Sequence, residues 1–266
     1  MVPLGPTPFR PIPFEPTPLG LIPFRFPGLA GISCVFTTRR GGHSLPPFDG
    51  VNLSFDVGDA PTTVAVNRRQ LAAGLGLSRW CECRQVHGDV LHIEPAPTPL
   101  GTAAVLEGDA LATSAPGLAL CIKTADCQPV LLAHASGRFV AALHVGWRGN
   151  VLDLPGSAVA RLCAHYGCDP AGLFAVRGPS LGPQQAQFTN FATEFGAGFR
   201  EFYDASAQTV DLWRLTRCQL EAAGLRPERI FGLDQCTQSN HQDFFSFRAA
   251  RVTGRQMALI WIGAGA

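Results

Sequence analysis

A cysteine and a histidine, Cys127 and His144, lie at the two open ends of a β-hairpin that the sequence predicts. Short apolar runs on either side of residues 135–138 indicate the two strands, and Ala-Ser-Gly-Arg between them carries a turn signal. With the serine and glycine at the centre of the turn, Pro129 faces His144 and Cys127 faces Gly146. Side chains two residues apart share one face of a sheet. We therefore expect Cys127 and His144 to lie close together on one face.

A thiol and an imidazole in contact support two chemistries. The thiolate can act as a nucleophile with the imidazole as its base, or both groups can bind zinc. A structural interpretation stands beside these two, in which Cys127 is a small buried hydrophobe and His144 a hydrogen-bonded core histidine. The flanking residues favour chemistry, because Asp126 is ionisable and the Gly-bounded turn 146–149 presents Arg148, a residue suited to phosphate or carboxylate.

The elements that must position these residues alternate between strand and helix without a regular βαβ repeat. This order favours an α/β fold, a mixed-sheet α/β sandwich in a single globular domain that spans residues 21–266. Residues 1–20 are rich in proline and predict an extended tail. The predicted strands are 32–37, 81–86, 90–93, 108–113, 118–122, 130–133, 139–143, 173–176, 230–233 and 257–262, and the predicted helices are 61–75, 151–165, 190–202 and 211–223.

Length and composition limit the function classes. The 266 residues suit one large domain or two small ones, and a hydrophobic content of 46% can supply a sizeable core. The net charge of +1 gives no sign of a nucleic-acid or anionic-membrane partner. No apolar stretch reaches the length of a membrane span. We therefore predict neither a nucleic-acid partner nor a membrane partner.

The cysteines and the start of the chain indicate where the protein works. Nine cysteines are scattered through the sequence and do not resemble a dense disulfide framework. The first residues contain no basic segment and no uninterrupted apolar core, so we expect no signal peptide and a cytoplasmic location. Cys81 and Cys83 are spaced less favourably for a metal than a C-x-x-C pair, and we interpret them as structural. His87 lies on a loop between two predicted strands, where spacing alone gives it no role.

Several short motifs follow one another along the chain. They are Thr37-Thr-Arg-Arg-Gly-Gly42, Asn52-Leu-Ser54, Asn67-Arg-Arg69, Gln85-Val-His-Gly88, Thr124-Ala-Asp-Cys-Gln-Pro-Val-Leu131, His144-Val-Gly-Trp-Arg-Gly149, Gly178-Pro-Ser-Leu-Gly-Pro183, Cys236-Thr237 and Phe244-Phe-Ser-Phe-Arg248. Each is weak alone, but the ordered set resembles the laccase-domain (YfiH-like) family, formerly called multicopper polyphenol oxidases. The resemblance runs from about residue 21 to the C-terminus and implies the family's mixed α/β sandwich.

The resemblance also implies a function, a metal and partners. It implies a purine nucleoside phosphorylase with adenosine deaminase activity, which takes adenosine, inosine, guanosine or methylthioadenosine together with phosphate. It places one metal, Zn²⁺ or alternatively copper, on His87, Cys127 and His144. Three protein ligands leave a fourth position open, as in catalytic zinc sites. A true multicopper oxidase needs paired histidine clusters, which the seven scattered histidines do not supply. We expect a monomer or a homodimer.

The roles expected of the site residues follow from the same resemblance and from their chemistry. The predicted catalytic residues are Cys127, His87, His144, Arg148 and Asp126. The arginine would contact an anion or the ribose, with Arg39 or Arg40 as alternatives, and the aspartate would orient a ligand or a water. Lys123 is expected to be exposed. Trp147 either stacks on a base or packs against its neighbours.

Two departures from the family pattern and two rival functions stay open. Gln184-Gln185 and Ala249-Ala250 stand where the family often has other residues, and both changes bear on substrate preference.

The first rival function is a Cys-His amide hydrolase that acts on a peptidoglycan precursor, with Cys127 as nucleophile and His144 as base. The second is a non-enzymatic binding module whose working part is the Pro-rich tail.

Overall fold

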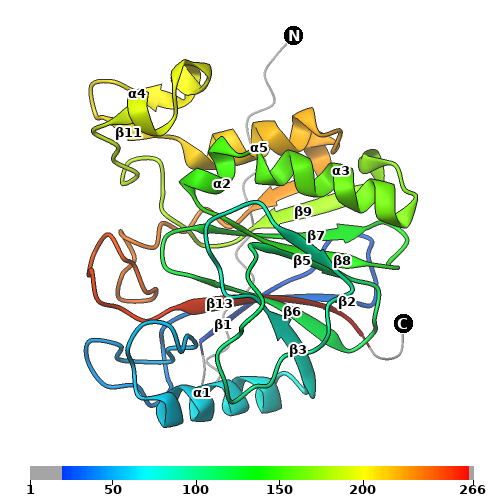
Figure 1. The fold of residues 1–266 in the computed structure, drawn as a ribbon, viewed down its shortest axis with the longest axis vertical. Coiled ribbons are helices and arrows are strands. Elements are labelled where there is room, and N and C mark those ends of the chain that lie inside the picture. The colour runs from blue at the N-terminus through cyan, green and yellow to red at the C-terminus, as the bar shows by residue number, and fades with distance from the viewer. Residues whose placement is uncertain (1–19, 264–266) are drawn as a thin grey trace.

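Two mixed β-sheets pack face to face, and helices cover the outer side of each sheet (Figure 1). The structure, a computed structural model, describes residues 20–263. The predicted mixed α/β sandwich in a single domain is confirmed, whereas the predicted Pro-rich tail lies outside the described residues but for Gly20. No helix within residues 20–263 is both long and apolar enough to cross a membrane.

The first sheet has five strands in the order β1-β2-β13-β6-β3. These strands are β1 (Leu21–Phe24), β2 (Ile32–Thr37), β13 (Gln256–Ile262), β6 (Leu118–Thr124) and β3 (Arg79–Glu82). Strands β3 and β6 pair in parallel, and the other neighbours are antiparallel. Strand β13, the last along the chain, lies at the centre. The sheet is therefore complete only when segments from both ends of the described chain have joined it.

The second sheet has six strands in the order β12-β9-β7-β8-β5-β4. They are β12 (Ile230–Gly232), β9 (Leu173–Arg177), β7 (Gln128–His134), β8 (Val140–Val145), β5 (Ala110–Thr113) and β4 (Leu91–Ile93). The hairpin β7–β8 forms its centre, and the parallel pairs β12–β9 and β4–β5 form its edges. A separate ribbon joins β10 (Tyr203–Asp204) to β11 (Thr209–Val210). The predicted hairpin thus belongs to the best buried part of this sheet.

Apolar side chains from the central strands fill the space between the two sheets. Leu120 and Ile122 of β6 belong to the same packed cluster as Leu131 of β7 and Ala142 of β8, and all four are fully buried. Strands that are buried on both faces read as nearly continuous apolar runs. This burial explains why the apolar runs in the sequence were enough to predict these strands.

Helices cover both outer faces of the sandwich (Figure 1). Helix α1 (Pro61–Gly74) packs on the first sheet through Leu71. Helices α3 (Leu154–Tyr166) and α5 (Leu212–Ala222) pack on the second sheet through Leu162 and Leu220. The shorter helices are α2 (Trp147–Val151) and α4 (Phe191–Glu194) and the 3₁₀ segments Pro170–Gly172, Ala197–Phe202 and Pro227–Arg229.

Two predicted helices were wrong in extent. The predicted helix 190–202 is divided, because Gly196 adopts a φ of +81° between α4 and the following 3₁₀ segment. The helix predicted from residue 151 begins at Leu154, where the side chain of Asp153 accepts a hydrogen bond from the Gly156 N–H and caps it. The turn predicted at 146–149 contains the start of α2, so Arg148 lies on a helix.

Candidate metal centre and active site

The open end of the β7–β8 hairpin brings a thiol and an imidazole together. Pro129 pairs with His144 across the two strands, which is the predicted register. His87, on the loop after β3, completes a group whose ligand atoms all lie within 4.8 Å of one another: His87, Cys127 and His144. The two imidazole rings meet edge to face with centroids 4.8 Å apart. The three residues that the resemblance implied as ligands therefore form one cluster.

The carboxylate of Asp109, at the start of β5, fixes two of these ligands. Its Oδ1 lies 2.7 Å from Nδ1 of His144. A carboxylate only accepts hydrogen bonds, so Nδ1 carries the proton and Nε2 is left free to act as a ligand or base. The same carboxylate accepts the backbone N–H groups of Val86, His87 and Gly88 at 3.2, 3.0 and 2.7 Å. Sequence reasoning missed Asp109, whose only signal was an acidic residue entering a predicted strand.

Backbone strain marks both sides of the cluster. His87 has a φ of +60° and Asp126 a φ of +92°, in the left-handed region that residues other than glycine rarely adopt. For His87 the three N–H groups gathered by Asp109 hold the strained turn in place. Strain of this kind persists where the surroundings over-determine the backbone, which is common at functional sites.

Gly146 lets the backbone pass close to the cluster. A Cβ at this position would lie 3.0 Å from Sγ of Cys127 and 3.2 Å from Cδ2 of His87. Both distances are shorter than ordinary van der Waals contacts between such atoms. A side chain at residue 146 would therefore push two of the three candidate ligands out of place.

The cluster favours an ionised thiol. Burial by itself would raise the pKa of Cys127, but the charge of His144 and hydrogen bonds from His144 and His87 lower it to about 6. Burial would likewise lower the pKa of His144, but the Cys127 thiolate and the hydrogen bond to Asp109 raise it to about 9. Thiolate is the form that binds metals and attacks electrophiles. The geometry thus supports both chemistries that the sequence left open.

A pocket of about 930 Å³ opens over the cluster. Its wall includes the three candidate ligands and a set of cationic residues, namely Arg84, Lys123, Arg148, Arg248, Arg251 and Arg255. The apolar part of the wall includes Trp147, Leu181, Phe188, Leu212 and Phe247. Such a pocket suits a ligand that combines an aromatic or apolar body with an anionic group.

The arginines proposed from the sequence divide between the pocket and the surface around it. Arg148 lines the pocket, and its guanidinium lies over the ring of Trp147 at 4.4 Å. Trp147 also contacts Phe188, so it packs and lines the pocket at once. Arg39 and Arg40 are not among the pocket-lining residues and form ion pairs with aspartates elsewhere. Of the three arginines, only Arg148 is thus placed to meet a ligand there.

Asp126 ties the start of β7 to distant loops. Its carboxylate accepts hydrogen bonds from the hydroxyl of Thr237 and from the backbone N–H of Arg248, each at 2.7 Å. Its carbonyl accepts the N–H of Leu181 at 2.8 Å. The residue lines the pocket beside Cys127, and these contacts join three wall segments at one point.

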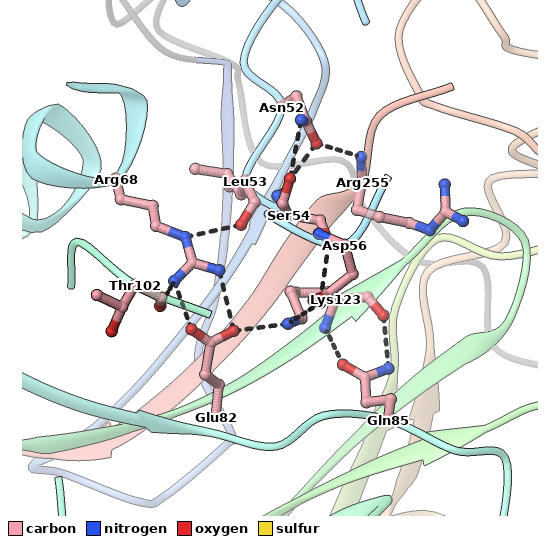
Figure 2. Close-up of polar contacts among 10 residues, drawn as sticks. All are labelled: Asn52, Leu53, Ser54, Asp56, Arg68, Glu82, Gln85, Thr102, Lys123 and Arg255. Atoms are coloured by element: carbon pink, nitrogen blue, oxygen red, sulfur yellow. Dashed lines mark hydrogen bonds and ion pairs between the residues drawn. The ribbon is translucent and has the colours of Figure 1, made fainter. Parts of the chain in front are cut away.

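Lys123 is buried, and its predicted exposure was wrong. Its ammonium contacts Glu82 at 2.8 Å and Asp56 at 3.1 Å, with only 5% of the side chain exposed. Glu82 in turn binds the buried guanidinium of Arg68 through both carboxylate oxygens (Figure 2). The lysine lies in a central strand, so its charge is tolerated only because carboxylates surround it.

The fold and the site together define a two-sheet α/β sandwich with a candidate His-Cys-His metal centre at the mouth of its central hairpin. The chain belongs to the family described as multi-copper polyphenol oxidoreductase laccase, whose family model matches residues 33–263. The resemblance that the motifs indicated is thereby confirmed.

Curated relatives share most of the chain. One is purine nucleoside phosphorylase YfiH of Escherichia coli (strain K12), which is 35% identical over 91% of this chain and 98% of its own length. A purine nucleoside phosphorylase of Deinococcus radiodurans is 38% identical over 91% of this chain and 93% of its own. The crystal structure of YlmD from Geobacillus stearothermophilus superposes with a TM-score of 0.82 at 29% identity, covering 94% of this chain and 98% of that one.

Proposed function

We propose that this protein is a zinc-dependent purine nucleoside phosphorylase that also deaminates adenosine at the same site. The observation that carries the proposal is the His87, Cys127 and His144 cluster beneath a pocket rich in arginine. Relatives that are 34–38% identical and are named purine nucleoside phosphorylases support the reaction class. The substrates are purine nucleosides, among them adenosine, inosine, guanosine and methylthioadenosine, with phosphate as the second substrate.

The three side chains fit a zinc ion by donor type and spacing. Zinc bonds of about 2.0–2.3 Å to thiolate and imidazole span ligand atoms 4.8 Å or less apart after small side-chain movements. Asp109 holds His144 in the tautomer that presents Nε2, and Gly146 leaves the space free. When bound there, zinc acts as a Lewis acid and lowers the pKa of a water to about 7. Copper is the alternative metal.

In phosphorolysis an oxygen of phosphate forms a bond to C1′ of the ribose while the bond from C1′ to N9 of the purine breaks. The electron pair of the broken bond goes to the base, which takes up a proton, and pentose 1-phosphate is released. The transition state resembles an oxocarbenium ion, so groups that bind the phosphate and hold the ribose do most of the work. The exposed Arg148 on α2 binds the anion or the ribose in this proposal.

In deamination water adds at C6 of adenine, the bond from C6 to the exocyclic nitrogen breaks, and ammonia leaves. Asp126 supports both reactions by holding the pocket wall beside Cys127. The apolar wall around Phe188 and Leu212 offers contact area for the purine. A cytoplasmic location belongs to the same proposal and is supported by the nine free thiols.

A second candidate function is a Cys-His amide hydrolase, with a peptidoglycan precursor as its substrate. The observation that favours it is the lowered pKa of Cys127 beside the raised pKa of His144, since an ionised pair of this kind can act without a metal. Chelators separate the two candidates. A metal-dependent phosphorylase loses activity when the metal is removed, whereas a Cys-His hydrolase retains it and is inactivated by alkylation.

The deciding experiment is chromatographic analysis of adenosine incubated with the zinc-loaded protein, with and without phosphate. Phosphate-dependent adenine and phosphate-independent inosine, both lost in Cys127→Ala, are the expected products. Cys218→Ala, a substitution on α5 outside the pocket, serves as the matched control and should keep both activities. No conversion by folded, metal-loaded protein would reject the nucleoside function and move the hydrolase to first place.

A further inference from the structure

Two of the cationic side chains that line the pocket, Lys123 and Arg84, are neutralised by carboxylates. Lys123 is held by Glu82 and Asp56, and Glu82 is also bound by Arg68. Figure 2 shows these contacts as one continuous network, of which Asp56 and Lys123 line the pocket. Arg84 is paired with Glu107 in the same way. The network therefore adds no net positive charge for a ligand to meet.

Three pocket-lining cations outside this network come from one short segment, residues 245–256, which leads into β13. They are Arg248, Arg251 and Arg255. None of them pairs with a carboxylate side chain among residues 20–263. Asp126 contacts this segment, but its carboxylate accepts the backbone N–H of Arg248 and not the guanidinium. The segment thus brings to one wall of the pocket three guanidinium groups that no direct ion pair neutralises.

Arg255 is the most enclosed of the three. Its backbone N–H donates to Asn52 at 2.9 Å, and its Nη1 donates to the carbonyls of Thr253 and Gly254 at 2.9 Å each. Nε and Nη2 have no hydrogen-bond partner in the described part of the chain. In Figure 2 the guanidinium extends away from the Lys123 network. A half-buried guanidinium with two free donor positions is suited to an oxyanion.

The electrostatic surroundings of Arg255 include the candidate metal ligand Cys127. Burial lowers the pKa of Arg255, and the anionic groups that counteract this effect are Cys127, Asp126 and Asp56. A guanidinium remains charged throughout the physiological range. The positive charge therefore lies within electrostatic reach of Cys127, where an anionic co-substrate would have to approach.

Contacts with aromatic rings and a carbonyl position the other two guanidinium groups. Arg248 donates from Nη1 to the carbonyl of Gln187 at 2.8 Å and lies over the ring of Phe188 at 5.2 Å. Arg251 lies over the ring of Phe247 at 5.5 Å. Rings of this kind orient a guanidinium without neutralising it. The charge of both residues stays available to a bound anion.

We propose that Arg255, assisted by Arg248 and Arg251, forms the subsite that binds inorganic phosphate. This inference rests on the proposed phosphorolysis, in which the subsite holds phosphate as it attacks C1′ and then holds the phosphate group of the pentose 1-phosphate. Arg255 contacts the attacking group and is a catalytic residue in this sense. Deamination needs no phosphate, so the two activities of one site should depend on Arg255 to very different extents.

The kinetic test is Arg255→Gln assayed for both reactions in the same preparation. The KM for phosphate should rise at least about tenfold, because a charge-assisted contact is lost, while phosphate-independent deamination stays within about twofold. Arg255→Lys should recover part of the phosphate affinity. The matched control is Arg138→Gln, at the turn of the β7–β8 hairpin and thus at its opposite end from Cys127, and it should leave both reactions unchanged.

Calorimetric titration with inorganic phosphate separates this inference from the proposed function. Phosphate binding that is lost in Arg255→Gln supports the subsite even if no phosphorolysis is found. Unchanged phosphate affinity and unchanged KM in the folded variant would overturn the subsite while the phosphorylase function stood. No phosphate binding by the unmodified protein would also overturn it. Titration with adenosine 5′-monophosphate tests the other source of a phosphate group, and Arg255-dependent binding of that nucleotide alone would overturn the assignment to inorganic phosphate.

Discussion

At the scale of single residues, Asp109 connects the candidate ligands, and its replacement tests that link. Asp109→Asn should weaken zinc affinity by about 10–100-fold, because an amide can donate as well as accept and no longer fixes the protonated Nδ1 of His144. Competition with a fluorescent zinc chelator measures the change. Asp89→Asn, an exposed residue in the loop that carries His87, is the control and should bind zinc normally. Equal affinities in the two variants would show that Asp109 does not orient the centre.

The thiol of Cys127 gives a second prediction at this scale, in the metal-free protein. Because the thiolate is the reactive form, a lowered pKa keeps the residue reactive in mild acid, and iodoacetamide labelling should be half-maximal near pH 6. Peptide mass spectrometry follows each cysteine separately. Cys218, whose pKa is raised by burial, should react only in alkaline solution. A Cys127 half-point at about pH 8.5, the ordinary thiol value, would contradict the ion pair with His144.

How much of the site the sequence could predict depends on how local the determining contacts are. The turn between Cys127 and His144 sets the register of the hairpin, and this register was enough to predict that the two side chains share a face. His87 and Asp109 meet them only because β4, β5 and β8 lie side by side in the second sheet. The spacing of residues along the sequence does not predict this strand order. His87 could be assigned only through the resemblance. The roles of Asp109 and Arg255 depend on contacts that only the tertiary structure brings together.

At the scale of elements, the approach of α2 to the hairpin depends on its N-cap residue, Gly146. Gly146→Ala should abolish zinc binding and activity, because the added Cβ would meet Cys127 and His87 at about 3 Å. The melting temperature of the metal-free protein should change little, since both contacted atoms are side-chain atoms that can move aside. Gly149→Ala, whose Cβ would meet its nearest neighbour at 3.6 Å, is the control. Metal analysis of both purified variants decides, and zinc retained by Gly146→Ala would refute the steric argument.

Helix α1 gives a second prediction at this scale, on stability. Its Arg68 is fully buried and binds Glu82 of β3, so the pair joins helix to sheet. Arg68→Met should cost about 3–5 kcal/mol in the free energy of unfolding, because it leaves a buried carboxylate short of a partner. Arg40→Met, which removes an exposed ion pair, should cost under about 1 kcal/mol. Urea unfolding measures both, and similar losses would mean that the buried pair has no special role.

The same elements mark where prediction from sequence becomes less certain. Strands buried on both faces were found, since their apolar runs are long and continuous. Residues 190–202 were predicted as one helix, yet they form two short pieces on either side of Gly196, and aromatic side chains from both pieces pack in one cluster. Lys123 was expected at the surface because a lone lysine usually is exposed. Its partners Glu82 and Asp56 come from other parts of the chain, and only the tertiary fold brings them together.

At the scale of the whole molecule, the candidate centre lies where the chain passes from one sheet to the other. His87 follows β3 of the first sheet and precedes β4 of the second, and Cys127 lies between β6 and β7 in the same way. His144 belongs to the second sheet itself. A metal held by all three would link two crossings between sheets to the central hairpin. Metal binding should therefore stabilise the packing of the two sheets as well as supply chemistry.

Removal of the metal tests this link. A ligand that binds only the native state stabilises it by about 2.7 kcal/mol at 100 times its Kd. For a chain of this size the melting temperature should fall by roughly 5–10 °C when a chelator strips the zinc. His87→Ala removes one exposed ligand with little cost to packing, so its melting temperature should respond far less to zinc or chelator. Differential scanning calorimetry with metal analysis of each sample measures the effect. Equal melting temperatures with and without one zinc per chain would contradict a metal centre that stabilises the packing of the two sheets. The metal would then have a catalytic role only.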